Sequence, residues 1–287
     1  MFNVHLVGMD RKILVQDGLY SINTDFMLEE SGQADLLIVP PIFGDMATAL
    51  ELNRSSLPWI RNQFENGAEV ASLCVGAFLL ASTGLLNGKK CSTHWAYYRE
   101  FEEMFPEVEV VDGGIITEEN GIYSSGGANS FWNLLLYILE KYTDRDTAIL
   151  ASKYFAIDFD RNSQAAFMMF KGQKDHRDEK VKQIQEYIEG NYGERMTVDG
   201  LAQRVAMSRR SFERRFKQAT GNTVVEYLQR VKIEAAKRSF ESSRKNISEV
   251  MYDVGYSDSK AFRNVFKKLT GLTPIEYRNK YNRDAVA

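Results

Sequence analysis

Few features of exported or membrane-inserted proteins occur in this sequence. Of its 287 residues only two are cysteines, Cys74 and Cys91, which is too few for a disulfide framework. No run of about 18 apolar residues is present, and no basic N-terminal segment precedes an apolar stretch, so neither a membrane span nor a secretory signal is predicted. We therefore expect a cytoplasmic protein that makes no contact with a membrane.

Metal-ligand spacings are absent as well. The chain contains no CxxC pair, no HxxxH pair and no acidic loop of the calcium type. Two of its histidines give no functional signal, because His5 falls in a predicted strand and His176 in a polar segment that we expect to be solvated. The sequence therefore predicts no metal ion and no cofactor.

The charge that is present is divided unequally along the chain. The length suits two domains, and 44% hydrophobic with 26% charged residues suits folded ones. Residues 1–179 contain 14 Lys and Arg against 26 Asp and Glu, a net charge of −12, whereas residues 180–287 contain 22 against 13, a net charge of +9. The basic half indicates contact with nucleic acid, although a merely solvated basic face would give the same asymmetry.

The basic half repeats itself with an offset of 50 residues. The matched positions are mostly apolar anchors and turn residues: Phe212 with Phe262, Phe216 with Phe266, Lys217 with Lys267, Thr220-Gly221 with Thr270-Gly271, Thr223 with Thr273, Glu226 with Glu276, and Tyr227 with Tyr277. Two copies of one packing unit are expected to share such positions.

Each copy predicts two helices joined by a short turn. Helical periodicity covers residues 198–205 and 209–219 in the first copy, and 247–254 and 259–269 in the second. Apolar residues face inward, whereas Arg, Lys, Asn and Glu face outward and can read base edges in a DNA major groove. The alternative is a helical bundle with charged outer faces, and two copies with the same basic face disfavour it.

These residues resemble the AraC/XylS family of DNA-binding domains. The resemblance covers residues 196–221 and 247–277, and its second-copy signature lies at residues 254–258 and 266–278. It implies that one long helix, about residues 225–241, joins the two units. It also implies that each unit places a recognition helix in one of two successive major grooves of double-stranded DNA, roughly 34–36 Å apart.

The resemblance also assigns roles to individual residues. The base-reading positions of the family correspond here to Arg210, Glu213, Arg214, Ser259, Lys260, Arg263 and Asn264. Contacts to phosphate are expected from Arg209, Lys217 and Lys267, which add affinity without sequence information. Ser259 is the weakest of these assignments, because a serine at a helix start can serve only as a cap.

The acidic half alternates short apolar runs with helical patterns, which is typical of an α/β sheet domain. We predict a strand over residues 3–7, a hairpin over 12–23, a buried parallel strand over 36–39, a helix over 57–66 and a strand over 69–73. Cys74 follows the last of these strands and precedes a helix predicted over 78–82. A cysteine at such a turn resembles a nucleophile elbow, where backbone N–H groups stabilise a thiolate.

The acidic half as a whole is similar to the PfpI-type, class I glutamine amidotransferase-like domain. Its pairing with an AraC-type domain resembles the GlxA family of regulators. The resemblance implies a flavodoxin-like α/β fold. Enzymatic relatives use a glutamate just after the first strand, and we expect that strand and its glutamate to be missing, because residues 1–8 lead straight into the hairpin. Either the domain is reduced, or the true start of the protein lies upstream of Met1. We therefore expect no catalytic residues and no enzymatic activity.

A ligand pocket is expected instead, because open parallel sheets bind ligands beyond the carboxyl ends of their strands. The candidate pocket residues are Cys74, His94, Ser124 and Ser125. The resemblance makes a small nitrogenous metabolite the first candidate for the effector. Alternatives remain: a cysteine hydrolase or amidase tethered to DNA, a ligand-independent DNA binder, or a purely structural Cys74 with His94 packed in the core.

The sequence thus predicts a regulator with three segments. Residues 1–170 form the sensor and dimerisation domain, residues 171–179 the linker, and residues 180–283 the DNA-binding domain with two helix-turn-helix units. We expect a sequence-specific transcription regulator that forms a homodimer through its N-terminal domain. Because AraC-type proteins are mostly activators, activation through RNA polymerase is the expected mode of action.

Overall fold

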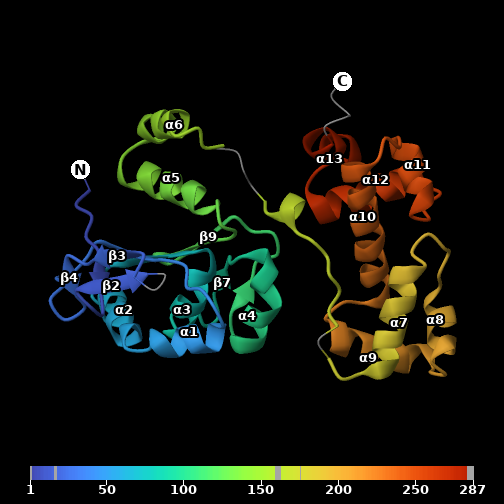
Figure 1. Cartoon of the computed structure of the whole chain (residues 1–287), viewed down its shortest axis with the longest axis horizontal. Coiled ribbons are helices and arrows are strands. Elements are labelled where there is room, and N and C mark those ends of the chain that lie inside the picture. Colours follow the sequence, from blue (N-terminus) through green and yellow to red (C-terminus); the bar gives the residue numbers. More distant parts are fainter. Residues whose placement is uncertain (1, 16–17, 159–162, 175, 283–287) are drawn as a thin grey trace. The chain divides into compact units, whose positions relative to one another are not determined.

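The computed structural model describes residues 2–15, 18–158, 163–174 and 176–282. The chain forms two compact units, Met1–Gln164 and Ala165–Ala287 (Figure 1). The boundary lies six residues before the one predicted from composition, because residues 165–170 pack with the helical unit. Of the helices in the described ranges, none is both long and apolar enough to cross a membrane.

The N-terminal unit is built on a four-stranded sheet. Its order is β5 (Leu36–Val39), β6 (Glu69–Leu73), β10 (Ile122–Ser125) and β9 (Ile116–Glu119). The pairs β5–β6 and β6–β10 are parallel, whereas β9 runs antiparallel to β10. The carboxyl ends of β6 and β10 therefore lie side by side, in a register that pairs Ser124 with Ser72 and Ser125 with Leu73.

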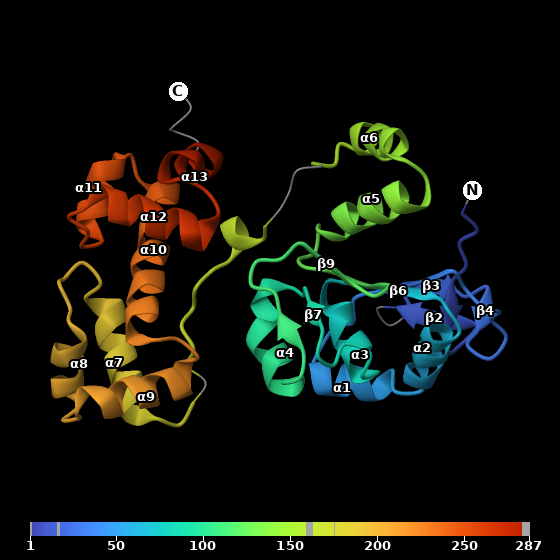
Figure 2. The same cartoon turned by 180° about the vertical axis from the view of Figure 1, so that it is seen from behind.

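Alternating side chains of the central strands enter two separate cores. Val70 and Ile122 belong to the larger core, while Ala71 and Tyr123 belong to the smaller one, as the period of two in a strand requires. Helices cover one face of the sheet: α1 (Met46–Leu52), α2 (Ser56–Glu65), α3 (Ala77–Ser82) and α4 (Tyr98–Met104). The other face is covered by α5 (Phe131–Tyr142), on which α6 (Arg145–Tyr154) packs (Figures 1 and 2).

Short strands complete this unit, and they confirm one prediction and correct another. They are β1 (Val7–Gly8) with β4 (Phe26–Met27), β2 (Lys12–Val15) with β3 (Tyr20–Asn23), and β7 (Lys90–Cys91) with β8 (Glu109–Val110). The hairpin is confirmed, although residues 16 and 17 of its turn lie outside the described residues. The strand predicted over 3–7 is wrong except at Val7, since the Leu6 N–H donates to the carboxylate of Asp25 (2.8 Å) instead of to a strand.

The strand predicted over residues 36–39 is parallel, but it is not buried on both faces. It forms an edge of the sheet as β5, and 39% of Ile38 is exposed. An apolar run alone does not distinguish an edge strand from a central one. The helix predicted over 57–66 and the strand over 69–73 are confirmed as α2 and β6.

The C-terminal unit contains the two predicted helix-turn-helix units. Its helices are α7 (Glu179–Gly190), α8 (Val198–Arg204), α9 (Arg209–Thr220), α10 (Val224–Ser242), α11 (Ile247–Asp253), α12 (Ser259–Thr270) and α13 (Pro274–Tyr281). Two hydrophobic cores form, one around Phe212 and Phe216 and the other around Phe262 and Phe266. The long helix α10 contributes to both, with Val231 in the first and Phe240 in the second.

The repeat in the sequence appears as repeated hydrogen bonds. The hydroxyls of Thr220 and Thr270 each donate, at 2.8 Å, to the carbonyl four residues earlier. Thr223 and Thr273 begin α10 and α13 with the same capping box. In addition, the hydroxyl of Tyr227 donates to Glu189 on α7, and that of Tyr277 to Glu241 on α10. Helix α7 therefore supports the first unit as α10 supports the second.

The segment predicted as a linker over 171–179 is instead packed on the helical unit in its described residues, 171–174 and 176–179, while residue 175 lies outside them. Gln173 accepts a hydrogen bond on its carbonyl from Gln185 (2.8 Å), and Lys174 pairs with Glu189 (2.6 Å). The His176 ring contacts the Gln185 side chain at 2.9 Å, so it is not the solvated residue that we expected. Asp178 then caps α7. Polar composition alone indicated a linker, but these polar groups have partners that are distant in sequence.

Glycine at the end of α9 provides a test of the helical unit. Gly221 has a φ of +72° and a Cβ built on it meets nothing within 4 Å, so alanine adds only backbone strain. We expect Gly221→Ala to lower the free energy of unfolding by about 1 kcal/mol. The matched control is Gly190→Ala, also in open space but with helical backbone, which should raise it by about 0.5 kcal/mol.

The two units can be followed separately in this test. All three tryptophans, Trp59, Trp95 and Trp132, lie in the N-terminal unit. In both variants the urea concentration at the midpoint of unfolding should therefore shift when unfolding is followed by far-UV circular dichroism. The midpoint followed by tryptophan fluorescence should stay unchanged. Shifts of the same sign in both variants would contradict the assigned left-handed cap.

Candidate functional sites

The exposed face of α9 is the first candidate nucleic-acid interface. Ser208 caps the helix start, and Phe212 and Phe216 are fully buried. This burial turns Arg210 and Arg214 toward solvent, where within the described residues neither forms an ion pair. Both guanidinium groups are therefore available to a partner.

Arg209 differs from its neighbours, because two carboxylates hold it. Its guanidinium donates to Asp199 (3.1 Å) and to Glu213 (3.3 Å), so one predicted base reader is paired with one predicted phosphate contact. The side chains of all three are between 44% and 59% exposed. Exposed pairs of this kind contribute only about 0–1 kcal/mol, and DNA phosphate can replace them.

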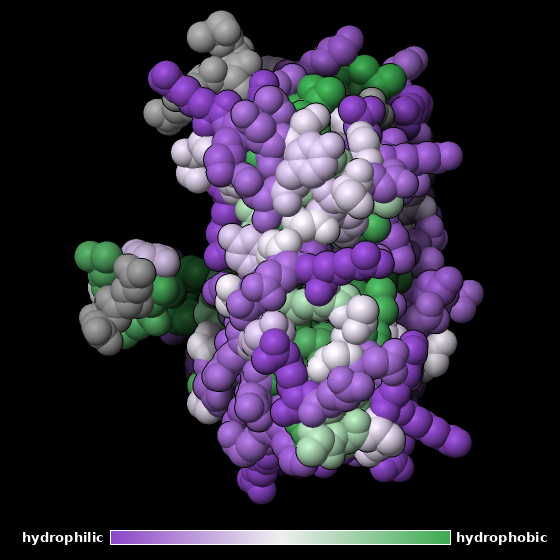
Figure 3. Space-filling model, turned by 90° about the vertical axis from the view of Figure 1, so that its right-hand side faces the viewer, coloured by the Kyte–Doolittle hydropathy of each residue, from purple (hydrophilic) through white to green (hydrophobic). Residues whose placement is uncertain are grey.

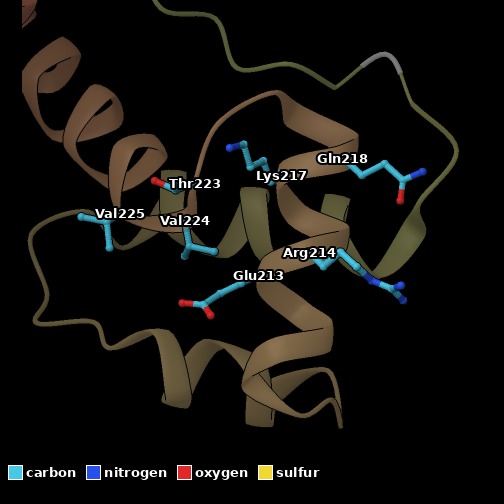
Figure 4. Close-up of a pocket in the computed structure, with 7 residues that line it drawn as sticks. All are labelled: Glu213, Arg214, Lys217, Gln218, Thr223, Val224 and Val225. Atoms are coloured by element: carbon cyan, nitrogen blue, oxygen red, sulfur yellow. The ribbon is translucent and has the colours of Figure 1, made fainter.

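A surface hollow of about 630 Å³ lies between α9 and the start of α10. Figure 4 shows Glu213 and Lys217 on the side of α9 that faces Val224 and Val225, whereas Arg214 extends from the other side. The two predicted readers Glu213 and Arg214 therefore point in different directions. Lys217 lies one turn beyond Glu213, near the end of the helix.

The exposed face of α12 is the second candidate. Asp258 caps this helix and accepts from the N–H groups of Lys260 (2.7 Å) and Ala261 (3.0 Å). Ser259 is therefore the first helical residue and not the cap. The other residues predicted to contact DNA are all exposed on this helix: Lys260, Arg263, Asn264 and Lys267. Hydrophilic side chains cover most of the face shown in Figure 3, with hydrophobic ones visible between them and in a projection at the left edge of the view.

In the N-terminal unit, Cys74 occupies a strained turn between β6 and α3. Its φ is +54°, a region that non-glycine residues seldom adopt. Gly76 follows at a point of close approach, where a Cβ would lie 2.5 Å from the carbonyl oxygen of Pro40. The predicted elbow is therefore present in its backbone geometry, and the carbonyl groups at the end of β5 pack closely against it.

Hydroxyl groups surround this elbow. The Cys74 N–H donates to Ser125 Oγ (3.4 Å), Thr93 Oγ1 donates to the Cys74 carbonyl (3.1 Å), and the Ser92 N–H donates to Ser124 Oγ (2.8 Å). Two further hydroxyls, of Ser92 and Ser130, are buried without a hydrogen-bond partner in the described part of the chain. We call the set the Cys74 cluster: Cys74, Ser92, Thr93, Ser124, Ser125 and Ser130.

The structure brings three of the predicted pocket residues into this cluster, but it engages the fourth elsewhere. His94 begins a short 3-10 helix, and its Nδ1 accepts from the N–H of Ala96 (3.1 Å). Burial lowers the pKa of His94, and within the described residues no hydrogen bond joins it to Cys74. Because Nδ1 is an acceptor here, the neutral ring carries its proton on Nε2, which disfavours His94 as a base for the thiol.

Gln164 is a residue of this region that the sequence did not reveal. It is almost fully buried, and its Nε2 donates to the carbonyls of Thr93 (3.0 Å) and Gly114 (2.7 Å) and to the Tyr98 hydroxyl (3.1 Å). Its Oε1 accepts from the Trp95 N–H (3.3 Å). A glutamine outside any periodic segment carries no sequence pattern that would have identified it.

These features define a class of protein: an α/β domain with a cysteine elbow, joined to a helical domain with two helix-turn-helix units. Comparison with known families agrees with it. Residues 1–141 match the DJ-1/PfpI family, and residues 201–280 match a helix-turn-helix domain family. In the described residues no group of three His, Cys, Asp or Glu side chains is placed to hold a metal ion.

Similar proteins include two transcriptional regulators and one DNA-binding domain. The HTH-type transcriptional regulator GbdR of Pseudomonas aeruginosa is 25% identical over 97% of this chain and 75% of its own. The regulator GlxA of Rhizobium meliloti is 23% identical over 75% of this chain and 66% of its own. The DNA-binding domain of AdpA, solved with a target DNA, is 31% identical over 35% of this chain and 91% of that chain, with a TM-score of 0.35.

The chain belongs to the AraC family of helix-turn-helix transcription regulators, in the group that carries an N-terminal DJ-1/PfpI domain. The predicted resemblance to GlxA-type regulators is thereby confirmed. The protein binds DNA through its helix-turn-helix domain.

The protonation of Cys74 provides a test of the elbow. Burial raises the pKa of the Cys74 thiol, and the N–H of Val75 only partly opposes this. In a Cys91→Ser variant, which leaves one thiol, we expect iodoacetamide alkylation to rise continuously with pH beyond about 8.5, the ordinary cysteine value. Cys91 requires removal although burial raises its pKa to about 12. An alkylation rate that already levels off near neutral pH would show an activated thiolate and contradict the raised pKa of Cys74.

Proposed function

We propose that this protein is a sequence-specific transcription regulator controlled by a small polar metabolite that binds at the Cys74 cluster. The observation that carries the proposal is the pair of buried hydroxyls, of Ser92 and Ser130, that have no partner in the described residues. A buried polar group without a hydrogen bond is costly, and a ligand that pairs with it gains affinity. Cys74, Ser124 and Ser125 belong to this cluster, and His94 is the residue after Thr93 in the chain.

On DNA, each of the two recognition helices carries residues that read base edges and residues that contact phosphates. Base edges are read by Arg210, Glu213, Arg214, Ser259, Lys260, Arg263 and Asn264. Phosphates are contacted by Arg209, Lys217 and Lys267. The support for this division is the exposure of these side chains on the faces opposite the buried phenylalanines.

A second candidate function is cysteine hydrolase or amidase chemistry, which the positive φ of Cys74 favours. The engagement of His94 Nδ1 and the raised pKa of the thiol both oppose it. We therefore propose that the elbow serves binding and that the domain is not an enzyme.

Two finer features complete the proposal. The protein forms a homodimer through the N-terminal domain, supported by exposed apolar side chains on its hairpin, where Leu14 is 65%, Leu19 77% and Tyr20 51% exposed. A monomer in sedimentation velocity at micromolar concentration would exclude this.

The regulator acts in the cytoplasm as an activator that contacts RNA polymerase, in keeping with most AraC-type proteins.

The effector is tested by thermal shift with a panel of small nitrogenous metabolites. A compound that binds the folded state should stabilise it by about 2.7 kcal/mol at 100 times its dissociation constant. Cys74→Ala and His94→Ala should each reduce that shift and the response of a reporter gene. His5→Ala, which alters an exposed histidine outside the cluster, serves as the control. An unchanged response in both the Cys74 and the His94 variant would exclude a pocket at this place.

Base reading and anchoring are separated by two substitutions on α9. Arg214→Ala should relax the preference for one base pair and cost about 1–3 kcal/mol at the preferred site only. Lys217→Ala should weaken binding to all sequences alike and flatten the salt dependence by about one unit of slope. Binding isotherms on a randomised operator library at two salt concentrations measure both effects. Identical behaviour of the two variants would contradict the assigned roles.

A further inference from the structure

The nitrogen of Gln164 occupies a position that is rich in acceptors. Two carbonyls, of Thr93 and Gly114, and the hydroxyl of Tyr98 surround Nε2 within 3.1 Å. A primary amide nitrogen carries only two protons for these three oxygens. The position therefore recognises an N–H donor group, and the Trp95 N–H beside it recognises the oxygen of the same amide.

Glycines shape the surroundings of this amide. A Cβ on Gly126 would lie 1.9 Å from Nε2 of Gln164, and one on Gly127 would lie 3.0 Å from its Oε1. The unpaired hydroxyls border the same place, since Ser130 Oγ is 3.3 Å from the Cβ position of Gly127 and Ser92 Oγ is 2.6 Å from that of Gly114. The Gln164 carboxamide therefore fills one part of the Cys74 cluster and leaves two hydroxyls beside it unused.

The residues that follow Gln164 belong to the helical unit. Residues Ala165–Phe167 form a short 3-10 helix that contacts α12. The Tyr281 hydroxyl donates to the Ala166 carbonyl (3.4 Å), and the buried ammonium of Lys237 on α10 donates to the carbonyl of Met168. These residues are therefore fixed on the second helix-turn-helix unit.

The same segment continues to the first helix-turn-helix unit. The N–H of Phe170 donates to Glu234 on α10 (3.2 Å), and Gln173 is held by Gln185 of α7 and by Asn222 after α9 (3.2 Å). We call residues 165–174 the strap. The strap contacts both helix-turn-helix units, and it lies beside α10, which joins them (Figures 1 and 2). Its first residue is bonded covalently to Gln164.

We propose that the Gln164 carboxamide is a built-in occupant of the Cys74 cluster, and that an effector with a carboxamide-like N–H donor group displaces it and thereby loosens the strap on both helix-turn-helix units. The inference rests on the proposed sensor function and names its ligand class and its route to DNA. A tethered side chain acts at an effective concentration in the millimolar range. A free ligand can compete with this tethered amide because it also pairs with the Ser92 and Ser130 hydroxyls, which Gln164 does not use.

Hydrogen exchange of the full chain, with and without a fragment that replaces the missing amide, tests the proposal. Gln164→Ala removes four heavy atoms, the same four that acetamide contains. We expect exchange to rise by about tenfold in residues 93–97 and in the strap, since buried partners lose their hydrogen bonds. Acetamide at millimolar concentration should restore protection in both segments. N,N-dimethylacetamide, which lacks N–H donors, should restore neither.

A second variant keeps the test valid where a cavity would disturb folding. Gln164→Glu has the same size but directs an oxygen at the Thr93 and Gly114 carbonyls, so exchange should rise in both segments and acetamide should not reverse it. Gln203→Ala, an exposed glutamine on α8, should change neither segment. Tryptophan fluorescence establishes that the N-terminal unit of each variant is folded.

Two results would overturn the proposal. Faster exchange in residues 93–97 with an unchanged strap would make Gln164 a local packing residue. Failure of acetamide to protect Gln164→Ala would remove the proposed ligand class. Neither result affects the sensor function itself, which is decided by the metabolite response of the Cys74 and His94 variants, in which Gln164 is intact.

Discussion

Burial of two phenylalanines one helical turn apart determines how each recognition helix is presented. In α9 the rings of Phe212 and Phe216 lie 5.6 Å apart, and in α12 those of Phe262 and Phe266 lie 5.8 Å apart. A tyrosine from the following helix packs edge-on against the second ring of each pair, a favoured geometry for aromatic pairs. Because a helix has one inward stripe, fixing it fixes the outward one. The basic face follows from the aromatic packing.

The long helix α10 extends this constraint from one unit to the other. It supplies Val231 to the first core and Phe240 to the second, so the two cores share this one helix. The buried ion pair between Lys237 and Glu234 lies between these two positions and holds the strap by its Met168 carbonyl and Phe170 N–H. A buried pair is stabilising only when its remaining hydrogen-bonding capacity is used. The strap uses it, which explains why these charges are tolerated inside a small helical domain.

The sequence predicted those parts of the fold that depend on neighbours in the chain. The ends of α8 to α12 agree with prediction within a residue or two, because caps such as Ser208 and Gly221 act locally. The strand predicted over 3–7 and the linker over 171–179 failed, because partners distant in sequence decide them: the carboxylate of Asp25 and the amide of Gln185. The same reason explains the site. Cys74 stood out by its position after a strand, whereas Gln164 matters only through contacts that no local pattern encodes.

The Cys74 elbow shows how an enzyme-like backbone can be suited to binding. The positive φ of Cys74 and the close approach of Gly76 to Pro40 hold the turn in its strained form whatever chemistry follows. Catalysis would also require a base near the thiol, yet His94 uses Nδ1 to cap a helix turn. What remains is a rigid turn beside buried hydroxyls, and rigidity lowers the entropic cost of ordering a site around a ligand. The retained strain therefore favours recognition, and in this chain the group recognised first is the amide of its own Gln164.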